Sequence, residues 1–191
     1  MIAPLPDLRH AARIVLATML CLIAAPGQAS NWDLQSIGIR LQVGEKSRVI
    51  GALQPESFHE SDIEAVFGLP WERMFQSGWE ARARLVTHAG VLRGQSDSAL
   101  VAVAIPTLTF GTQNGSFLID TGLGLAYLSR HRFDLQDFGG PLQFALTLGM
   151  EVPLFDHFAA GYRFMHYSDA GFYAPGTIGA DMHMVELLYR F

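Results

Sequence analysis

Cysteine is almost absent from this sequence, which contains one, Cys21, in 191 residues. Cys21 lies inside an apolar run, Ile14–Ala25, and lacks the small-residue context that precedes a lipoprotein cysteine. We expect it to be removed together with that run, which leaves a mature chain without cysteine. Disulfides and thiolate metal sites are then excluded as sources of stability, even in an exported protein.

Long apolar runs are also missing from most of the chain. After residue 29 no stretch of about 18 uninterrupted apolar residues occurs, which excludes membrane-spanning helices from this part of the chain. Yet 50% of all residues are hydrophobic. Membrane strands need only every second residue to be apolar, so they account for this content better than helices do.

Basic residues are scarce, with 13 Lys and Arg against 18 Asp and Glu. Removing residues 1–29 takes away Asp7, Arg9 and Arg13, which leaves 17 acidic and 11 basic residues. This acidic balance argues against a nucleic-acid partner.

The first 29 residues have the pattern of a secretory signal peptide. Arg9 and Arg13 precede the apolar run, and small residues lead up to Ala29. The run has 12 residues, too few for a spanning helix, which needs about 20. Cleavage after Ala29 is therefore favoured over an uncleaved anchor. The remaining residues, 30–191, suit one exported domain.

Alternation of apolar and polar residues is the strongest signal that the sequence does contain. Each alternating segment predicts a strand with one apolar and one polar face. The fourth segment is apolar on both faces and interrupted by Pro106, and its β-branched content supports its assignment. The eight expected strands are 36–43, 62–69, 79–89, 99–110, 117–127, 142–150, 158–168 and 181–191.

The charged residues of these segments decide between two all-β folds. They all fall on the non-apolar face: Arg40, Glu64, Glu80, Arg82, Arg84, Asp120, Arg163, Glu186 and Arg190. A closed barrel in a membrane would pair them in its lumen, whereas a secreted sandwich would expose them to water. The strand lengths favour the barrel, and the closing Tyr189 and Phe191 resemble the ends of bacterial outer-membrane proteins. We predict an eight-stranded antiparallel transmembrane β-barrel in the bacterial outer membrane, with both termini in the periplasm.

Two residues that carry chemistry stand at the outer end of the seventh strand. His166 and Ser168 share the apolar, lipid-facing parity and are two residues apart, so the imidazole can activate the hydroxyl as a nucleophile. Asp181, at the start of the eighth strand, is the best-placed acid to orient the imidazole. The alternative is that both are ordinary residues of the membrane interface.

The segment Arg163–Gly171, with its H-x-S-x-A-G core, resembles the PagL-like lipid A 3-O-deacylase family. Phe117–Leu128 and Phe138–Met150 are similar to the same family. The resemblance implies an eight-stranded outer-membrane barrel that hydrolyses the ester-linked acyl chain at position 3 of lipid A, with lipopolysaccharide as its partner and no cofactor.

Carried over by position, the resemblance implies Ser168 as nucleophile and His166 as base. It implies Asp181 as the acid if the loop between Pro175 and Gly179 has one extra residue. In the family an Asn follows the Ser and is proposed to bind the oxyanion beside a later glycine; here these positions are Asp169 and Gly171. An ionised carboxylate cannot donate a hydrogen bond. Asp169 therefore contributes only its backbone N–H, or is protonated, or lowers the activity.

Other polar residues are interpreted as structural, and we expect no metal site. His88 is interpreted as a lumen residue, because no second His or Cys stands at ligand spacing. Arg130, His131 and Arg132 suit either a solvated loop or contacts with lipopolysaccharide phosphates. A non-catalytic barrel with a structural or ligand-binding role remains the alternative function, as does an esterase for phospholipid or another lipid ester. The sequence leaves open whether the chain is a monomer or a homodimer.

Overall fold

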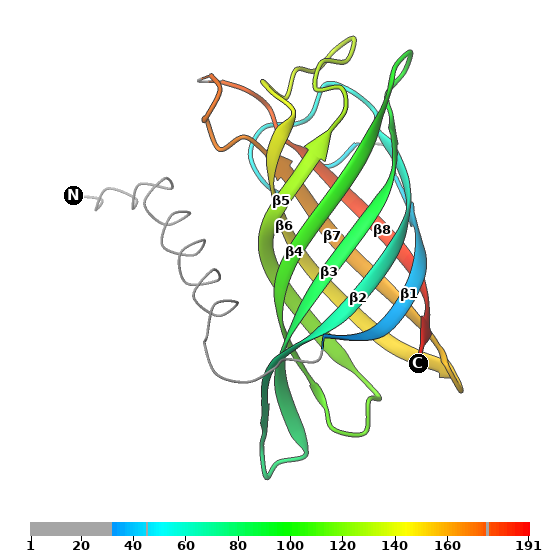
Figure 1. Ribbon diagram of the computed structural model, residues 1–191. Coiled ribbons are helices and arrows are strands. Elements are labelled where there is room, and N and C mark those ends of the chain that lie inside the picture. The colour runs from blue at the N-terminus through cyan, green and yellow to red at the C-terminus, as the bar shows by residue number, and fades with distance from the viewer. Residues whose placement is uncertain (1–31, 45, 175) are drawn as a thin grey trace, which may run out of the picture.

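The computed structural model describes residues 32–44, 46–174 and 176–191, which form eight strands. The strands are β1 (Asp33–Gln42), β2 (His59–Met74), β3 (Trp79–Arg93), β4 (Ser98–Thr112), β5 (Leu118–Leu128), β6 (Leu142–Phe155), β7 (Phe158–Ser168) and β8 (Ala180–Arg190). Each pairs with the next in antiparallel fashion, and β1 pairs with β8 to close a barrel (Figure 1). The predicted eight-stranded barrel is confirmed, and the open sandwich is excluded. The expected signal peptide, residues 1–29, lies outside the described residues.

Among the residues that the structure describes, no helix is both long enough and apolar enough to cross a membrane.

The second strand is longer than its alternation predicted. It continues from Leu69 through Pro70 to Met74, with an irregular register between Gly68 and Glu72 opposite β3. Proline has no N–H to donate to a ladder and is tolerated where the pairing is interrupted. Because the extra residues of the irregularity shift the alternation, the sequence pattern ends before the strand does.

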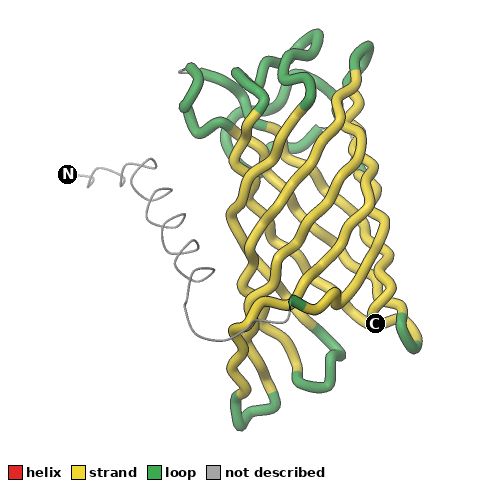
Figure 2. Tube along the Cα trace, in the orientation of Figure 1, coloured by secondary structure: helices red, strands yellow, loops and turns green. Residues whose placement is uncertain are grey.

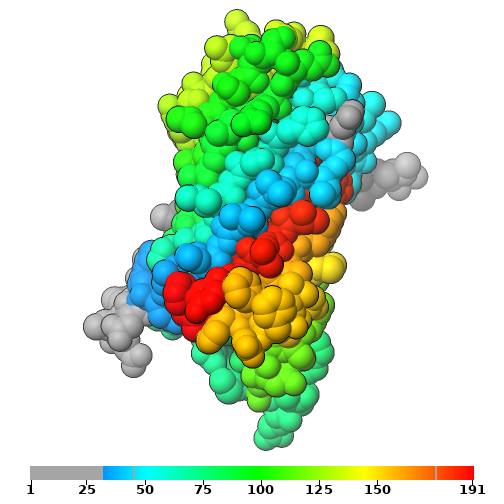
Figure 3. Space-filling view, turned by 90° about the vertical axis from the view of Figure 1, so that its right-hand side faces the viewer, coloured from blue at the N-terminus to red at the C-terminus, as the bar shows by residue number. Residues whose placement is uncertain are grey.

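The seam between the first and last strands closes the barrel. Residues 36–42 of β1 pair with residues 184–190 of β8. Figure 3 shows this seam from outside, with β8 in red between β1 in blue and β7 in orange. Closure leaves no unpaired edge along these residues, which is the condition for strands in a lipid bilayer.

The outer wall of the barrel is apolar. Its large exposed side chains include Ile37, Ile39, Leu41, Ile63, Leu100, Leu108, Leu125, Leu148, Met150, Val185 and Leu187. A continuous apolar wall of this kind would be unfavourable in water and is favourable against lipid chains.

Buried charges fill the lumen. Nε of Arg163 donates to Glu186 at 2.6 Å, and its Nη1 donates to Asp120 at 2.7 Å. Arg40 donates to both oxygens of Asp62, at 2.7 and 3.0 Å. A Cβ at Gly149 would lie 2.8 Å from Cζ of Arg163, so the absence of a side chain there makes room for the guanidinium.

Most of the charges expected in the lumen are buried there: Arg40, Glu64, Glu80, Arg84, Asp120, Arg163 and Glu186. Arg82 and Arg190 are exceptions, with side chains 31% and 27% exposed. Both line the same polar hollow as Asp33, the first residue of β1, and Phe191, at the mouth of the lumen opposite to the long loops.

An apolar cluster also packs in the lumen, beside the buried polar side chains. Val101, Val103 and Ile105 of β4 belong to one buried cluster with residues such as Met165 and Met182. The inward face of β4 therefore meets apolar side chains, while its outward face meets lipid. This is why its sequence lacks alternation.

Loops and turns differ in length between the two ends of the barrel (Figure 2). The turns 75–78, 113–117 and 156–157 are short. At the other end lie the outer loops L1 (43–58), L2 (94–97), L3 (129–141) and L4 (169–179). The longer loops L1, L3 and L4 thus lie at the end opposite to the start of β1 and the end of β8, and by the usual pattern of such barrels we assign them to the outer side.

We predict that Arg163→Met strongly destabilises the barrel, because it leaves Asp120 as a buried charge without an ion-pair partner and Glu186 with only the more distant Arg40, at 3.8 Å. Removing one member of a buried ion pair typically costs about 3–5 kcal/mol. Arg130→Met is the matched control, because Arg130 pairs with Asp97 at the surface and such pairs contribute at most about 1 kcal/mol. The midpoint of heat-induced unfolding, followed by the gel mobility of the detergent-solubilised barrel, should fall for Arg163→Met only. Equal midpoints in the two variants would refute the role of this network.

Candidate active site

His166 and Ser168 lie on the outer wall at the outer end of β7. Their neighbours Met165 and Tyr167 point into the lumen and are 0% exposed, whereas His166 and Ser168 are partly exposed. Strand alternation therefore directs both side chains toward the lipid, as their parity predicted.

Asp181 lies directly opposite His166 in the antiparallel pairing of β7 with β8. Its Oδ1 is 2.6 Å from Nδ1 of His166. The position of Asp181 at the start of the eighth strand predicted it as the acid, and the resemblance implied it only with one extra residue between Pro175 and Gly179. The strand register sets the side chains of Asp181 and His166 side by side. Asp181 is only 3% exposed, although its parity is outward, because L1 covers it.

Two backbone N–H groups of L1 hold the other carboxylate oxygen of Asp181. Val49 N donates to Oδ2 at 2.6 Å and Ile50 N donates to it at 2.9 Å. The Asp181 N–H in turn donates to Oε1 of Gln54 at 3.0 Å. With Oδ2 engaged by L1, Oδ1 is left to accept from the His166 Nδ1–H, and Nε2 of His166 can then accept a proton.

Gly179 leaves the space between His166 and Ser168 open. A Cβ there would lie 2.9 Å from Cε1 of His166 and 3.1 Å from Cβ of Ser168. Both side chains thus lie against the same glycine, and a larger residue would press on them. None of the described groups forms a hydrogen bond with the Ser168 hydroxyl.

Asp169 organises L4 instead of presenting its carboxylate to the site. It accepts hydrogen bonds from Gly171 N at 2.9 Å, Tyr173 N at 3.0 Å and Thr177 Oγ1 at 2.5 Å. Burial acts to raise the pKa of Asp169, but these hydrogen bonds outweigh it and lower the pKa below its ordinary value. The carboxylate is therefore ionised at neutral pH, against the alternative in which it is protonated. The Gly171 N–H, expected to face an oxyanion, donates to Asp169 instead.

His88 has two carboxylate neighbours that sequence spacing did not reveal. Its Nδ1 lies 3.8 Å from Glu60 and 3.4 Å from Asp62, and the three side chains are buried in the lumen. Their potential ligand atoms all lie within 4.8 Å of one another. The carboxylates come from the neighbouring strand, so only the pairing of β2 with β3 brings them to His88. Arg40 already neutralises Asp62 through two hydrogen bonds.

The basic residues of L3 form ion pairs with acidic residues of the outer loops. Arg130 lies 2.7 Å from Asp97, and Arg132 lies 2.8 Å from Asp137, which also accepts from His131. A phosphate at this position would have to compete with these carboxylates, which favours the solvated-loop interpretation of this segment.

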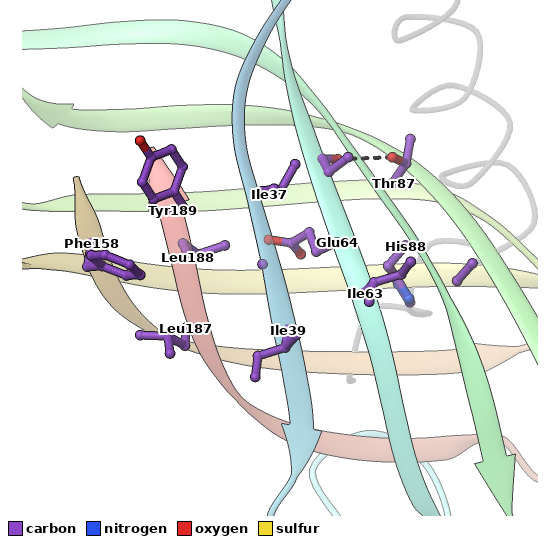
Figure 4. A pocket seen from close by; sticks show the side chains of 13 residues that line it. Ile37, Ile39, Ile63, Glu64, Thr87, His88, Phe158, Leu187, Leu188 and Tyr189 are labelled. Atoms are coloured by element: carbon purple, nitrogen blue, oxygen red, sulfur yellow. Dashed lines mark hydrogen bonds between the residues drawn. The ribbon is translucent and has the colours of Figure 1, made fainter. Parts of the chain in front are cut away.

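A hollow of about 700 Å³ lies on the outer wall, across the seam from β8 to β3 (Figure 4). Its lining includes large apolar side chains such as Ile39, Ile63 and Leu187, together with small residues such as Gly38 and Ala65. None of His166, Ser168 and Asp181 lines it. The candidate active site therefore lies elsewhere on the wall, where lipid chains can approach it directly.

Comparisons with known proteins agree with the barrel fold. Residues 62–190 match the family model described as lipid A 3-O-deacylase (PagL). The chain is also similar to a solved structure titled "Crystal structure of the outer membrane enzyme PagL", with a TM-score of 0.67 and 14% sequence identity. That alignment covers 82% of this chain and 99% of the other, and at this identity it shows the shared fold. The search of curated proteins finds no match.

We predict that Asp169→Asn loosens L4 and that Asp169→Ala loosens it further. The amide keeps only part of the acceptor set, and alanine keeps none, at a cost of about 0.5–1.5 kcal/mol for each hydrogen bond lost. Limited proteolysis with chymotrypsin checks this, because Phe172 in L4 is 79% exposed. Cleavage after Phe172 should speed up in the order wild type, Asn, Ala. Asp156→Asn, in a turn at the opposite end, is the control, and identical rates in all four proteins would contradict the prediction.

Proposed function

The chain belongs to the PagL family of lipid A 3-O-deacylases, and on that premise we propose that it removes the 3-linked acyl chain of lipid A by serine-ester chemistry. Membership makes it a lipid A hydrolase of the outer membrane. In the proposal Ser168 is the nucleophile, His166 is the base, and Asp181 positions His166 and stabilises its cationic form.

One observation carries this proposal: the 2.6 Å contact between Nδ1 of His166 and Oδ1 of Asp181, with Ser168 two residues along on the same face. An imidazole oriented through Nδ1 by a carboxylate has Nε2 available to take a proton from a hydroxyl. A rotation of the Ser168 side chain supplies the remaining contact, and such contacts are often formed only in the substrate complex.

The proposed reaction has two halves. Oγ of Ser168 attacks the ester carbonyl as its proton passes to Nε2 of His166, and an oxyanion forms. The intermediate collapses, the sugar oxygen at position 3 leaves with the proton from His166, and the acyl group stays on Ser168. Water then gives a proton to His166, attacks the acyl-enzyme and releases the fatty acid, with the proton returning to Ser168.

The oxyanion needs donors, and the carboxylate of Asp169 is not one of them. We assign this role to the backbone N–H of Asp169, which adjoins the nucleophile in the chain. For Gly171 to assist, its N–H would have to leave Oδ1 of Asp169, to which it donates at 2.9 Å. Because one oxyanion donor is typically worth about 3 kcal/mol, a rearrangement of L4 on substrate binding would be offset by the stabilisation it supplies.

The location of the site suits a substrate that stays in the membrane. On β6, Leu146 lies opposite His166 and Phe144 opposite Ser168. These apolar side chains on the outer wall offer contacts to an acyl chain, while L4 adjoins the site at the headgroup level. A lipid in the outer leaflet can therefore reach Ser168 without leaving the bilayer. A monomer and a homodimer are both compatible with the proposal, because one barrel carries all three residues. We also propose that the chain is exported and cleaved after Ala29.

We predict that Ser168→Ala and His166→Ala each lower deacylation by about 10³-fold or more, since one removes the nucleophile and the other its base. Asp181→Ala should retain roughly 10²-fold more activity than Ser168→Ala, because Asp181 acts through His166. Mass spectrometry of lipid A from cells that express each variant measures the loss of the 3-linked acyl chain.

Matched controls are available on the same outer wall. Ser61→Ala and His59→Ala change an exposed serine and histidine of β2 and should leave deacylation at the wild-type level. Unmodified lipid A in cells expressing the wild-type chain would favour a non-catalytic barrel. Release of fatty acid from phospholipid, with lipid A unchanged, would favour the other esterase.

A further inference from the structure

The outer end of β8 extends beyond its partner β1. The pairing of the two strands ends at Gln42 with Met184, and one further hydrogen bond joins Val43 N to the carbonyl of His183 at 2.7 Å. Beyond this point L1 lies against β8 in place of a strand. Asp181 stands in this part of β8, so the residues that cover it come from L1.

L1 holds the Asp181 carboxylate by backbone geometry. Two N–H groups, from Val49 and Ile50, converge on Oδ2 at 2.6 and 2.9 Å. Carboxylate groups bound by two donors lose their freedom to rotate, so Oδ1 stays directed at Nδ1 of His166. Any loosening of L1 would let the carboxylate turn toward water and away from the imidazole.

A histidine side chain also fastens this part of L1 to the barrel wall. Nε2 of His183 lies 2.7 Å from Oγ of Ser47, which precedes Val49 by two residues in L1. Nδ1 of His183 is hydrogen-bonded to the hydroxyl of Tyr162 on β7. The histidine side chain thus joins L1 to two strands, and it lies on the same face of β8 as Asp181.

We propose that Ser47 and His183 form a latch that keeps L1 in the position from which it orients Asp181. They are positioning residues, two steps removed from the reacting atoms, and this inference rests on the proposed function. L1 lies before residue 62, where the match to the family model begins. The latch belongs to the part of the chain outside that match.

The first experiment measures lipid A deacylation by the purified full-length protein in mixed micelles. Ser47→Ala removes the hydroxyl that His183 holds, and kcat should fall roughly five- to tenfold, the effect of losing one well-formed hydrogen bond. KM should stay within about twofold, because the latch does not meet substrate. Ser47→Thr keeps the hydroxyl and should restore most of kcat. Ser57→Ala, in the same loop but with a hydroxyl that bonds to none of the described groups, should match the wild type.

The second experiment tests whether the latch acts through Asp181. In an Asp181→Asn background the acid is already lost, so adding Ser47→Ala should change kcat by less than about twofold, and His183→Phe should behave in the same way. If Ser47→Ala lowers kcat equally in both backgrounds, L1 has a general structural role and the latch proposal is overturned.

A spectroscopic readout separates the latch from the reaction itself. The Nδ1–H proton of His166, hydrogen-bonded to a carboxylate, should give a low-field proton NMR signal that disappears in Asp181→Asn. Ser47→Ala should broaden or shift this signal, whereas Ser57→Ala should not. An unchanged signal in Ser47→Ala overturns the latch whether or not the protein deacylates lipid A. Full activity in Ser168→Ala refutes the proposed nucleophile. If the Ser168→Ala protein is active and the added change Ser47→Ala abolishes that activity, Ser47 is the nucleophile and both proposals are overturned.

Discussion

Closure of the backbone ladder is the constraint on which the rest of this structure depends. In a bilayer no water satisfies an unpaired N–H or C=O group, so the sheet must return to its first strand. The pairing of β1 with β8 achieves this. Once the barrel is closed, the register of every strand is fixed, and so is the side of the wall on which each side chain lies. The contact between His166 and Asp181 is one consequence of that register.

The closed wall separates two chemistries that would interfere with each other. Inside, Arg40 and Arg163 are held by carboxylates at hydrogen-bonding distance, and the network is isolated from lipid. Outside, a histidine, a serine and a covered aspartate interrupt an apolar surface at one position near the outer end. Because alternate residues of a strand point to opposite faces, the side chains of the site lie outside the lumen and do not take part in its charge network.

The outer loops hold side chains and backbone at the candidate active site in place. L1 supplies the N–H groups that hold Asp181, and L4 is shaped by Asp169, whose carboxylate collects three donors. Asp169 is thus a loop residue in a position that the resemblance had assigned to oxyanion binding. Where the family has Asn, Asp169 has no side-chain N–H to donate to an oxyanion. Its carboxylate is instead a stronger hydrogen-bond acceptor for the N–H and O–H groups of L4.

The sequence by itself determined the strand count, the outward or inward face of the alternating strand residues, and the pair His166 and Ser168, because a period of two is a local property of the chain. It missed the apolar cluster in the lumen, where Val101 and Val103 meet other apolar side chains, and the extension of β2 past Pro70. Only the tertiary structure decided which residues face each other across strands and loops: Asp181 with His166, His88 with Glu60 and Asp62, and L1 with β8. These contacts join residues up to 136 positions apart in the chain, and no local pattern encodes the register or loop path that brings them together.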